Sequence, residues 1–242
     1  MVISATRTVG RFLLALLTLL VSGMGFAQSE DMNVWLNTGT DEQRLQRLMQ
    51  IGVARDIAEN PVKGSVSPQI RWLPLSQPDF AVLFIPCQLD SAYLHLAMHT
   101  EAGWRVVDRM EFDCHYDESV AVEDAHVRKA ETEIFVHHAC EGRGTGYVEQ
   151  NFEVIDVAGG KLKTVLNVEE VHSESAPDGT YDLDQHSTFV IVPSRTYSRA
   201  IEETRSIDLN GKLSVQRRYF HWSTATKRYE VSKFTSVNDI SD

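Results

Sequence analysis

This sequence has few cysteines and lacks the short motifs that mark most catalytic and redox sites. Three cysteines occur in 242 residues, and none forms a Cys-x-x-Cys pair. The Gly-x-Ser-x-Gly elbow, the Ser-x-x-Lys pair and the His-Glu-x-x-His zinc motif are also missing. We therefore expect a non-catalytic protein without a cofactor or a bound metal. The alternative is an exported hydrolase whose carboxylates, or whose Cys/His pair, meet only in the folded chain.

Long apolar runs are missing outside the N-terminus. Arg7 and Arg11 precede an apolar run over residues 12–21, and small residues precede a cut after Ala27. This is the charge, core and cleavage pattern of a secretory signal over residues 1–27. We expect a periplasmic or secreted protein. No later run reaches the roughly 20 residues that a membrane-spanning helix needs, so no membrane span is expected after the signal is removed.

Basic side chains are in short supply. The chain carries 23 basic and 34 acidic side chains, and removal of the signal with its two arginines leaves 21 and 34, a formal charge of −13. Such a surface repels nucleic acid and anionic membrane and attracts a cationic partner. An acidic, solvated surface without any partner is the plainer alternative.

One helix is expected near the start of the exported chain, in a segment that spans residues 28–68. Residues 28–40 read as a polar lead-in, and apolar residues then recur at helical spacing over residues 41–59. Thr40 can cap this helix, with Gln43 at the capping-box position. Asn60 and Pro61 are expected to end it.

Short strands separated by turns fill residues 69–234, which we interpret as one all-β domain. Three very apolar runs end near Cys87, Cys140 and Ser194, so their ends lie 53 and 54 residues apart. Each run is followed by a more polar strand, a glycine turn and a third strand. The pattern predicts antiparallel meander sheets in about three repeats, arranged as a partial or open β-propeller, with a β-sandwich as the alternative. Residues 235–242 read as a polar tail.

This succession of an apolar strand, a polar strand, a glycine turn and a third strand resembles exported bacterial proteins with partial propeller repeats. The resemblance covers about residues 69–234 and implies architecture alone, because fold by itself does not assign a site or an activity. The calcium-loop motif of some such repeats is missing here.

The cysteines suggest one disulfide bond and one leftover thiol in an oxidising compartment. Cys87 and Cys140 end matching strands of neighbouring repeats, so we expect these two to pair. Cys114 follows an alternating strand on its core-facing side and is expected to be buried and inert.

An acidic, turn-like segment over residues 169–186 is the candidate contact surface for a partner. Its carboxylates could also bind calcium. The dense Asp-x-Asp-x-Asp-Gly loop of calcium sites is missing, however, and Gly179 is not at the position that such a loop requires. A solvated loop between repeats is the third interpretation. The carboxylates in question are Glu169, Glu170, Glu174, Asp178, Asp182 and Asp184.

The histidines do not form an obvious metal site. His95 and His99 share a strand face but lie about 13 Å apart, too far for one ion. His137 and His138 are adjacent and should point to opposite faces of a strand. A composite zinc site that joins one of them to Cys140 or Cys114 is the alternative.

Together these features predict an exported binding module that recognises a protein or a cell-envelope component. A specific version is an inhibitor or immunity protein that blocks a cationic enzyme, with acidic loops steering the association. The aromatic stretch Tyr219, Phe220 and Trp222 could add a ligand-stacking platform, although a closing strand packed on both faces is the simpler interpretation.

Overall fold

The computed structural model shows a mainly β protein with antiparallel sheets and few helices. Within the described part of the chain, no helix is long and apolar enough to cross a membrane. The expected signal at residues 1–27 lies outside the described residues. The structure describes residues 31–63, 70–88, 91–113, 120–125, 127–128, 131–141, 147–176, 179–180, 182–194 and 199–237.

Helices gather at the N-terminal end of the described chain. Residues 31–37 are helical, although their sequence was expected to be a polar lead-in; buried Leu36 anchors this turn in the core. Helix α2 (Asp41–Gln50) begins with the capping box that the sequence predicts, since Thr40 accepts from the Gln43 amide and the Gln43 side chain accepts from the Thr40 amide. Helix α3 (Arg55–Lys63) follows after a short break.

The single helix predicted over residues 41–59 is wrong, because the chain turns at Gly52. This glycine has φ +96°, a value that side chains with a Cβ rarely adopt. The carbonyl of Ile51 leaves the helix and accepts a hydrogen bond of 2.7 Å from the Val106 amide on a neighbouring strand. The predicted stop at Pro61 is also wrong, since α3 continues through it to Lys63; a proline so near the end removes a single helical hydrogen bond.

Replacing Gly52 by alanine is expected to lower the free energy of unfolding by about 1–2 kcal/mol. The cost comes from the positive φ, since the nearest atoms to an added Cβ, those of Val106, are 3.7 Å away and leave room for it. Urea denaturation measures the change, with exposed Gln50→Ala as the control. Equal stability of the two variants would show that the turn does not require glycine.

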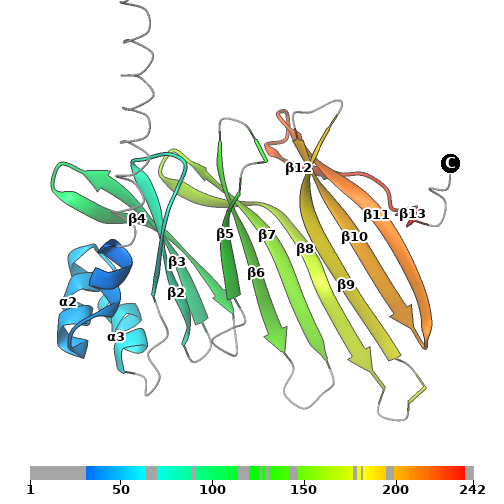
Figure 1. The fold of residues 1–242 in the computed structure, drawn as a ribbon, viewed down its shortest axis with the longest axis horizontal. Coiled ribbons are helices and arrows are strands. Elements are labelled where there is room, and N and C mark those ends of the chain that lie inside the picture. Colours follow the sequence, from blue (N-terminus) through cyan, green and yellow to red (C-terminus); the bar gives the residue numbers. More distant parts are fainter. Residues whose placement is uncertain are drawn as a thin grey trace, which may run out of the picture.

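Two antiparallel meanders follow the helices (Figure 1). Sheet A has the order β1-β2-β3-β4, and sheet B has the order β12-β11-β10-β9-β8-β7-β6-β5, with β13 beside β11. The strands of sheet A are β1 (Arg71–Pro74), β2 (Phe80–Gln88), β3 (Ser91–Thr100) and β4 (Gly103–Asp113). Those of sheet B are β5 (Val120–Ala125), β6 (Thr132–Glu141), β7 (Val148–Ala158), β8 (Lys161–Ser175), β9 (Asp182–Pro193), β10 (Arg199–Leu209), β11 (Lys212–Ser223), β12 (Arg228–Val231) and β13 (Thr235–Ser236).

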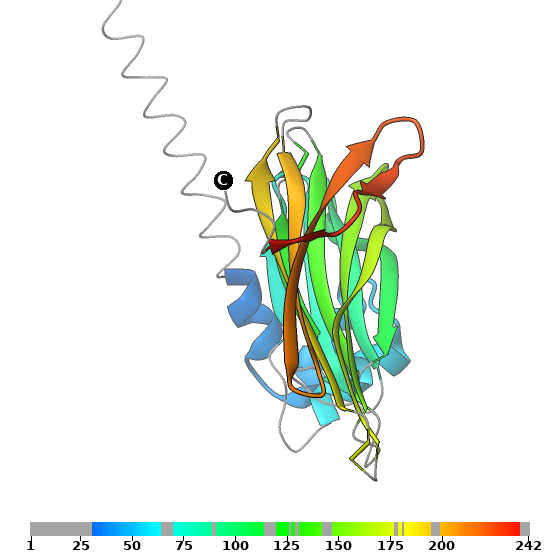
Figure 2. The ribbon, with the colours of Figure 1, turned by 90° about the vertical axis from the view of Figure 1, so that its right-hand side faces the viewer.

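The first strands of sheet B pack against one face of sheet A, and the helices cover the other face of sheet A (Figures 1 and 2). Phe84 and Leu94 of sheet A meet Val136 and Ile155 of sheet B in a shared core. Strands β9–β11 extend to the far side of the molecule from the helices (Figure 1). These strands therefore pack against other parts of sheet B rather than against sheet A.

Sheet B curls so that its later strands approach its middle. A separate core forms on its inner face, which we define as the face that carries Phe135, Phe152, Ile201 and Phe220. Strand β12 contacts β8 without being its neighbour in the sheet. The sheet stays open, since no described residues of β5 and β12 pair with each other. The outcome is a curved sheet with a partly enclosed inner side.

Three strand triplets stand where the sequence places its repeats: β2–β4, β6–β8 and β9–β11. The described residues form neither a closed barrel nor a propeller. Strand β8 pairs directly with β9, so the second and third triplets share one continuous sheet, unlike the separate blades that a propeller needs. The expected polar tail begins with β13, which pairs with Gln216 and Arg217 of β11.

Candidate functional site

A fully buried carboxylate lies at the centre of the inner face of sheet B. Glu203 of β10 has no exposed surface. Its Oε1 accepts hydrogen bonds of 2.9 Å from the Ser187 hydroxyl and from Arg205 Nε, and its Oε2 accepts one from Arg218 Nε at 2.5 Å. The strand register brings these side chains together, because Glu203 is opposite Arg218 on β11 and Arg205 is opposite Ser187 on β9. We call these four residues the Glu203 cluster.

An aromatic side chain from the edge of the sheet covers both arginines. The Phe234 ring centroid is 4.2 Å from the guanidinium carbon of Arg218 and 4.8 Å from that of Arg205. Phe234 follows β12 on the edge that continues into β13. The Ser232 amide still bonds to the Tyr219 carbonyl at 2.8 Å there, which keeps the edge attached to β11. Cation–π contacts of this kind hold the guanidinium planes in place.

A cavity of about 390 Å³ opens beside the Glu203 cluster, between β8 and the strands β10–β12. Arg205, Arg218 and Glu169 supply its charged groups, and apolar side chains supply a smaller part of its surface. Its volume lies in the range of small-molecule sites. The cavity is lined by Leu166, Asn167, Val168, Glu169, Arg205, Arg218, Phe220, Tyr229 and Val231.

One end of the inner side is closed by a second buried cluster around Arg128. Glu133 has no exposed surface, and its carboxylate accepts from the Arg128 amide at 3.0 Å, from Arg128 Nε at 2.9 Å and from the Tyr229 hydroxyl at 2.5 Å. Arg128 also pairs with Asp156, and its guanidinium carbon lies 3.9 Å from the centroid of the Trp222 ring. Side chains therefore join β6 and β7 to β11 and β12, where no backbone ladder does.

This second cluster shifts the pKa values of its members. Burial raises the pKa of the Tyr229 hydroxyl, and the adjacent Glu133 carboxylate raises it further. Burial acts to lower the pKa of Arg128, but the carboxylates of Glu133 and Asp156 outweigh it, so the pKa is raised. Tyr229 therefore stays a hydrogen-bond donor and Arg128 stays charged over the range in which proteins fold.

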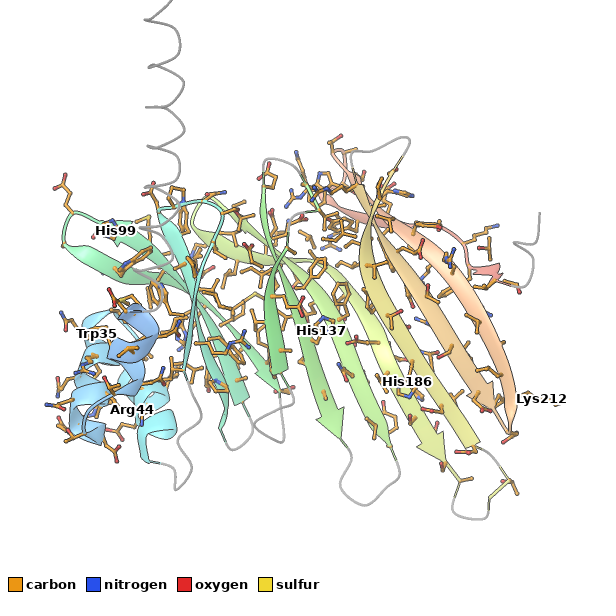
Figure 3. The ribbon with its side chains drawn as sticks, in the orientation of Figure 1. Trp35, Arg44, His99, His137, His186 and Lys212 are labelled. Carbon is orange, nitrogen blue, oxygen red and sulfur yellow. The ribbon has the colours of Figure 1, made fainter. Side chains whose placement is uncertain are left out.

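The two adjacent histidines point to opposite faces of β6, as predicted. His137, labelled in Figure 3 near the middle of sheet B, bonds through Nδ1 to Glu170 Oε2 at 2.7 Å. His138 bonds through Nε2 to Glu153 Oε1 at 3.0 Å and lies against Phe112 of sheet A. No three metal-binding side chains converge among the described residues. The composite zinc site stays untested, because the side chains of Cys140 and Cys114 that it requires lie outside the described part of the structure.

Five of the six acidic residues of the candidate contact surface lie on strands β8 and β9, and their role as a contact surface stays a prediction. Residues 169–175 and 182–186 belong to β8 and β9, so the expected loop is a long hairpin. Glu169 and Glu170 bond to neighbouring side chains: Gln185 donates to Glu169, and Gln150 donates to Glu170. Near the end of the hairpin, Ser173 donates a hydrogen bond to Asp184 and Ser175 donates one to Asp182. Glu174 is exposed, and Asp178 lies outside the described residues.

The predicted Cys87–Cys140 disulfide stays a prediction, because these two side chains and Cys114 lie outside the described part of the structure. The backbone places Cys87 on β2 of sheet A and Cys140 on β6 of sheet B. Their strands therefore belong to different sheets.

A second cavity of about 410 Å³ lies between residues 31–37 and the β3–β4 turn, with Trp35 and Trp104 in its wall. Trp104 is already engaged there, since its ring makes edge contacts with Trp72 and His99, both with centroids 4.9 Å apart. Fixed charged groups do not converge on it as they do on the first cavity. We therefore take the first cavity as the candidate site.

Sequence reasoning missed the Glu203 cluster, although one signal was present. Ile201, Glu203 and Arg205 alternate on one strand face, so a charged pair follows a core residue on the same side. The aromatic stretch was noted, and the structure places Phe220 in the core with 2% exposure and in the cavity wall. No protein-family model, curated protein or solved structure matches this chain, so its function is argued from this geometry.

Proposed function

We propose that this protein is an exported, non-catalytic binding protein that holds its ligand in the cavity on the inner face of sheet B. The observation that carries the proposal is the pair of arginines fixed at the cavity wall by the buried Glu203. Burying charged groups carries a large desolvation cost, so such a cluster is weak evidence for stability and suggests another role. A preorganised polar group in a partly apolar cavity is the usual design of a small-ligand site.

Binding fits the described side chains better than hydrolysis does. The pair of His138 and Glu153 is bonded to structural partners: His138 bonds to Glu153 Oε1, and the Thr164 hydroxyl donates to the other oxygen of that carboxylate. This group is packed between the sheets, where a substrate has no access. The exported hydrolase therefore remains the weaker alternative.

The acidic charge supports a second part of the proposal, contact with a protein or cell-envelope component that is cationic. Glu174 and Asp184 have exposed carboxylates at the free end of sheet B, with side-chain exposures of 54% and 52%. Two hydrogen bonds connect the ends of the two hairpins. The Asn210 amide donates to the Asp182 carbonyl, and the Asp182 amide donates to Asn210 Oδ1. We place this contact in the periplasm or outside the cell, and its association should weaken with salt.

We also propose that the three strand triplets are repeats of one structural pattern, the part of the partial-propeller interpretation that does not require separate blades. In each triplet the turn into the third strand uses a glycine with positive φ: +105° at Gly103, +72° at Gly160 and +78° at Gly211. A shared requirement for this backbone conformation at equivalent places supports a common plan.

Filling the cavity tests the proposed function. Val231 lines it and is 53% exposed, so Val231→Trp can fill the cavity without disturbing a buried core. The matched control is Val190→Trp, since Val190 is 50% exposed on β9 and does not line the cavity. Native mass spectrometry of the protein purified after export is expected to show a bound ligand with the parent and the control, and at least about tenfold less with Val231→Trp. Equal ligand in all three forms would refute the cavity as the site.

A further inference from the structure

Arg218 has hydrogen-bond donors that the protein does not use. Among the described residues its Nε bonds to Glu203, while its terminal Nη1 and Nη2 have no hydrogen-bond partner. The side chain is 17% exposed and lines the cavity. A guanidinium that is held through Nε presents its two Nη groups as a fork, which suits a carboxylate or a phosphate.

Arg205 is more fully engaged than Arg218. It bonds to Glu203, to Gln185 Oε1 at 3.3 Å through Nη1, and to the Glu169 carbonyl at 3.4 Å through Nη2. Its charge still acts on the cavity, whose wall it shares with Arg218. Arg205 therefore supports a bound anion electrostatically, and Arg218 is the residue free to contact it.

The carboxylates of Glu203 and Glu169 balance the charges of Arg205 and Arg218, so an anion would be held by hydrogen-bond donors rather than by a net positive charge. Glu203 is buried beneath the two arginines and shares its single charge between them. Glu169, the other acidic residue of the wall, accepts at Oε1 from Gln185, and His172 Nδ1 lies 3.5 Å from the same oxygen. Arg218 thus lines the cavity with two terminal nitrogen groups that make no hydrogen bond to the described residues.

We propose that Arg218 binds the anionic group, a carboxylate or a phosphate monoester, of a small ligand whose apolar part contacts the rest of the cavity. This inference rests on the proposed function and names its ligand class. Val168 and Phe220 supply apolar surface, and the cavity of about 390 Å³ accommodates a ligand of modest size.

Binding of three matched probes tests the proposal: octyl phosphate, octanoate and neutral octanol, with inorganic phosphate as the headgroup alone. Isothermal titration calorimetry is expected to show that the two amphiphilic anions bind the parent protein more tightly than octanol and inorganic phosphate do. Arg218→Met is expected to lower the affinity for the two amphiphilic anions about 10- to 100-fold and to change the affinity for octanol by less than about twofold. The comparison of octyl phosphate with octanoate separates a phosphate from a carboxylate ligand.

Arg217→Met is the matched control, because Arg217 directly precedes Arg218 on β11, points to the opposite face and pairs with Glu202 at 3.3 Å. It should keep the parent affinity within about twofold. Circular dichroism and urea denaturation check that the variants fold. If Arg218→Met does not fold, Arg218→Lys replaces it, with an expected loss of several-fold that Arg217→Lys does not show.

The outcomes separate this inference from the proposed function. If Val231→Trp abolishes probe binding while Arg218→Met matches Arg217→Met, the cavity is the site and the anion assignment is wrong. If octanol binds as tightly as octyl phosphate, or if neither anion binds the parent, the anion assignment is also wrong. If anions bind equally well to the parent and to Val231→Trp, the cavity itself is not the site and both proposals fail.

Discussion

Glu133→Ala is expected to lower the free energy of unfolding by about 3–5 kcal/mol. Glu133 is the buried acceptor that joins Arg128 to Tyr229, and its loss removes three hydrogen bonds at once. The remaining guanidinium, whose side chain is 13% exposed, then keeps Asp156 as its one carboxylate partner. Leaving a buried charge short of partners is among the largest costs of a single substitution.

Two further variants make this prediction specific. Tyr229→Phe removes one hydrogen bond to the same carboxylate and is expected to cost about 2 kcal/mol. Glu123→Ala on β5 is the control, since Glu123 is exposed and its loss should change stability by less than about 0.5 kcal/mol. Urea denaturation measures all three. Amide exchange should also become faster in β12 of Glu133→Ala, because that strand is tied to β6 through this carboxylate.

Similar stabilities of Glu133→Ala and Glu123→Ala would contradict the role given to this cluster. The curl of sheet B would then depend on apolar packing of its inner core alone. Unchanged exchange in β12 alongside a large loss of stability would show that the cluster stabilises the β6 region without holding the far strands.

Acidification is expected to destabilise the protein through His95, by about 3 kcal/mol between pH 6.5 and pH 4. His95 on β3 is 1% exposed, and both of its ring nitrogens lack hydrogen-bond partners among the described residues. Burial lowers the pKa of His95 from 6.5 to about 4, and the charge of Arg109, its partner across β3 and β4, adds to this. Burial under the helices thus keeps the imidazole neutral.

The sign follows from proton uptake by the unfolded chain. As the pH falls below 6.5, His95 takes up a proton in the unfolded state and stays neutral in the folded state until about pH 4. The unfolded state is therefore favoured increasingly over this interval, and the effect levels off below it.

His95→Leu isolates this contribution from that of the carboxylates. Free energies of unfolding measured at pH 7 and pH 4 should differ by about 3 kcal/mol less in His95→Leu than in the parent. Leu96→Met, at the next position of β3 and also buried, should lower stability by a similar amount at both pH values. A pH dependence that is the same in His95→Leu and in the parent would show that His95 is already bonded or solvated.

Local features of this fold could be predicted from the sequence because neighbouring residues determine them. The capping box of Thr40 and Gln43 is decided within four residues, and the turn at Asn210 and Gly211 has the two positive φ values, +54° and +78°, that such a pair favours. The opposite directions of His137 and His138 follow from strand alternation alone.

Features that depend on distant contacts were not predictable in the same way. The break at Gly52 is fixed by the bond between Ile51 and Val106, which are 55 residues apart. Because β8 pairs with β9, two triplets share one sheet, and no local sequence pattern in either strand indicates this pairing. The segment around Asp182 and Asp184 was expected to be a loop, because it is rich in charged residues and shows no clear alternation of apolar and polar residues; it forms strand β9.

The candidate site was hidden for the same reason. Glu203 and Arg218 lie on different strands, and their pairing depends on a register that composition does not reveal. Phe234 was placed at the end of the domain, yet its ring packs over arginines of β10 and β11. A buried charge cluster becomes recognisable only when the strands that carry it are aligned.

The position of a bound anion can be observed in a crystal structure of the protein with octyl phosphate. We expect the phosphate within hydrogen-bond distance of Arg218 Nη1 or Nη2, with the octyl chain against Val168 and Phe220. A phosphate bound at any other place, with the cavity beside Glu203 unchanged, would contradict this expectation.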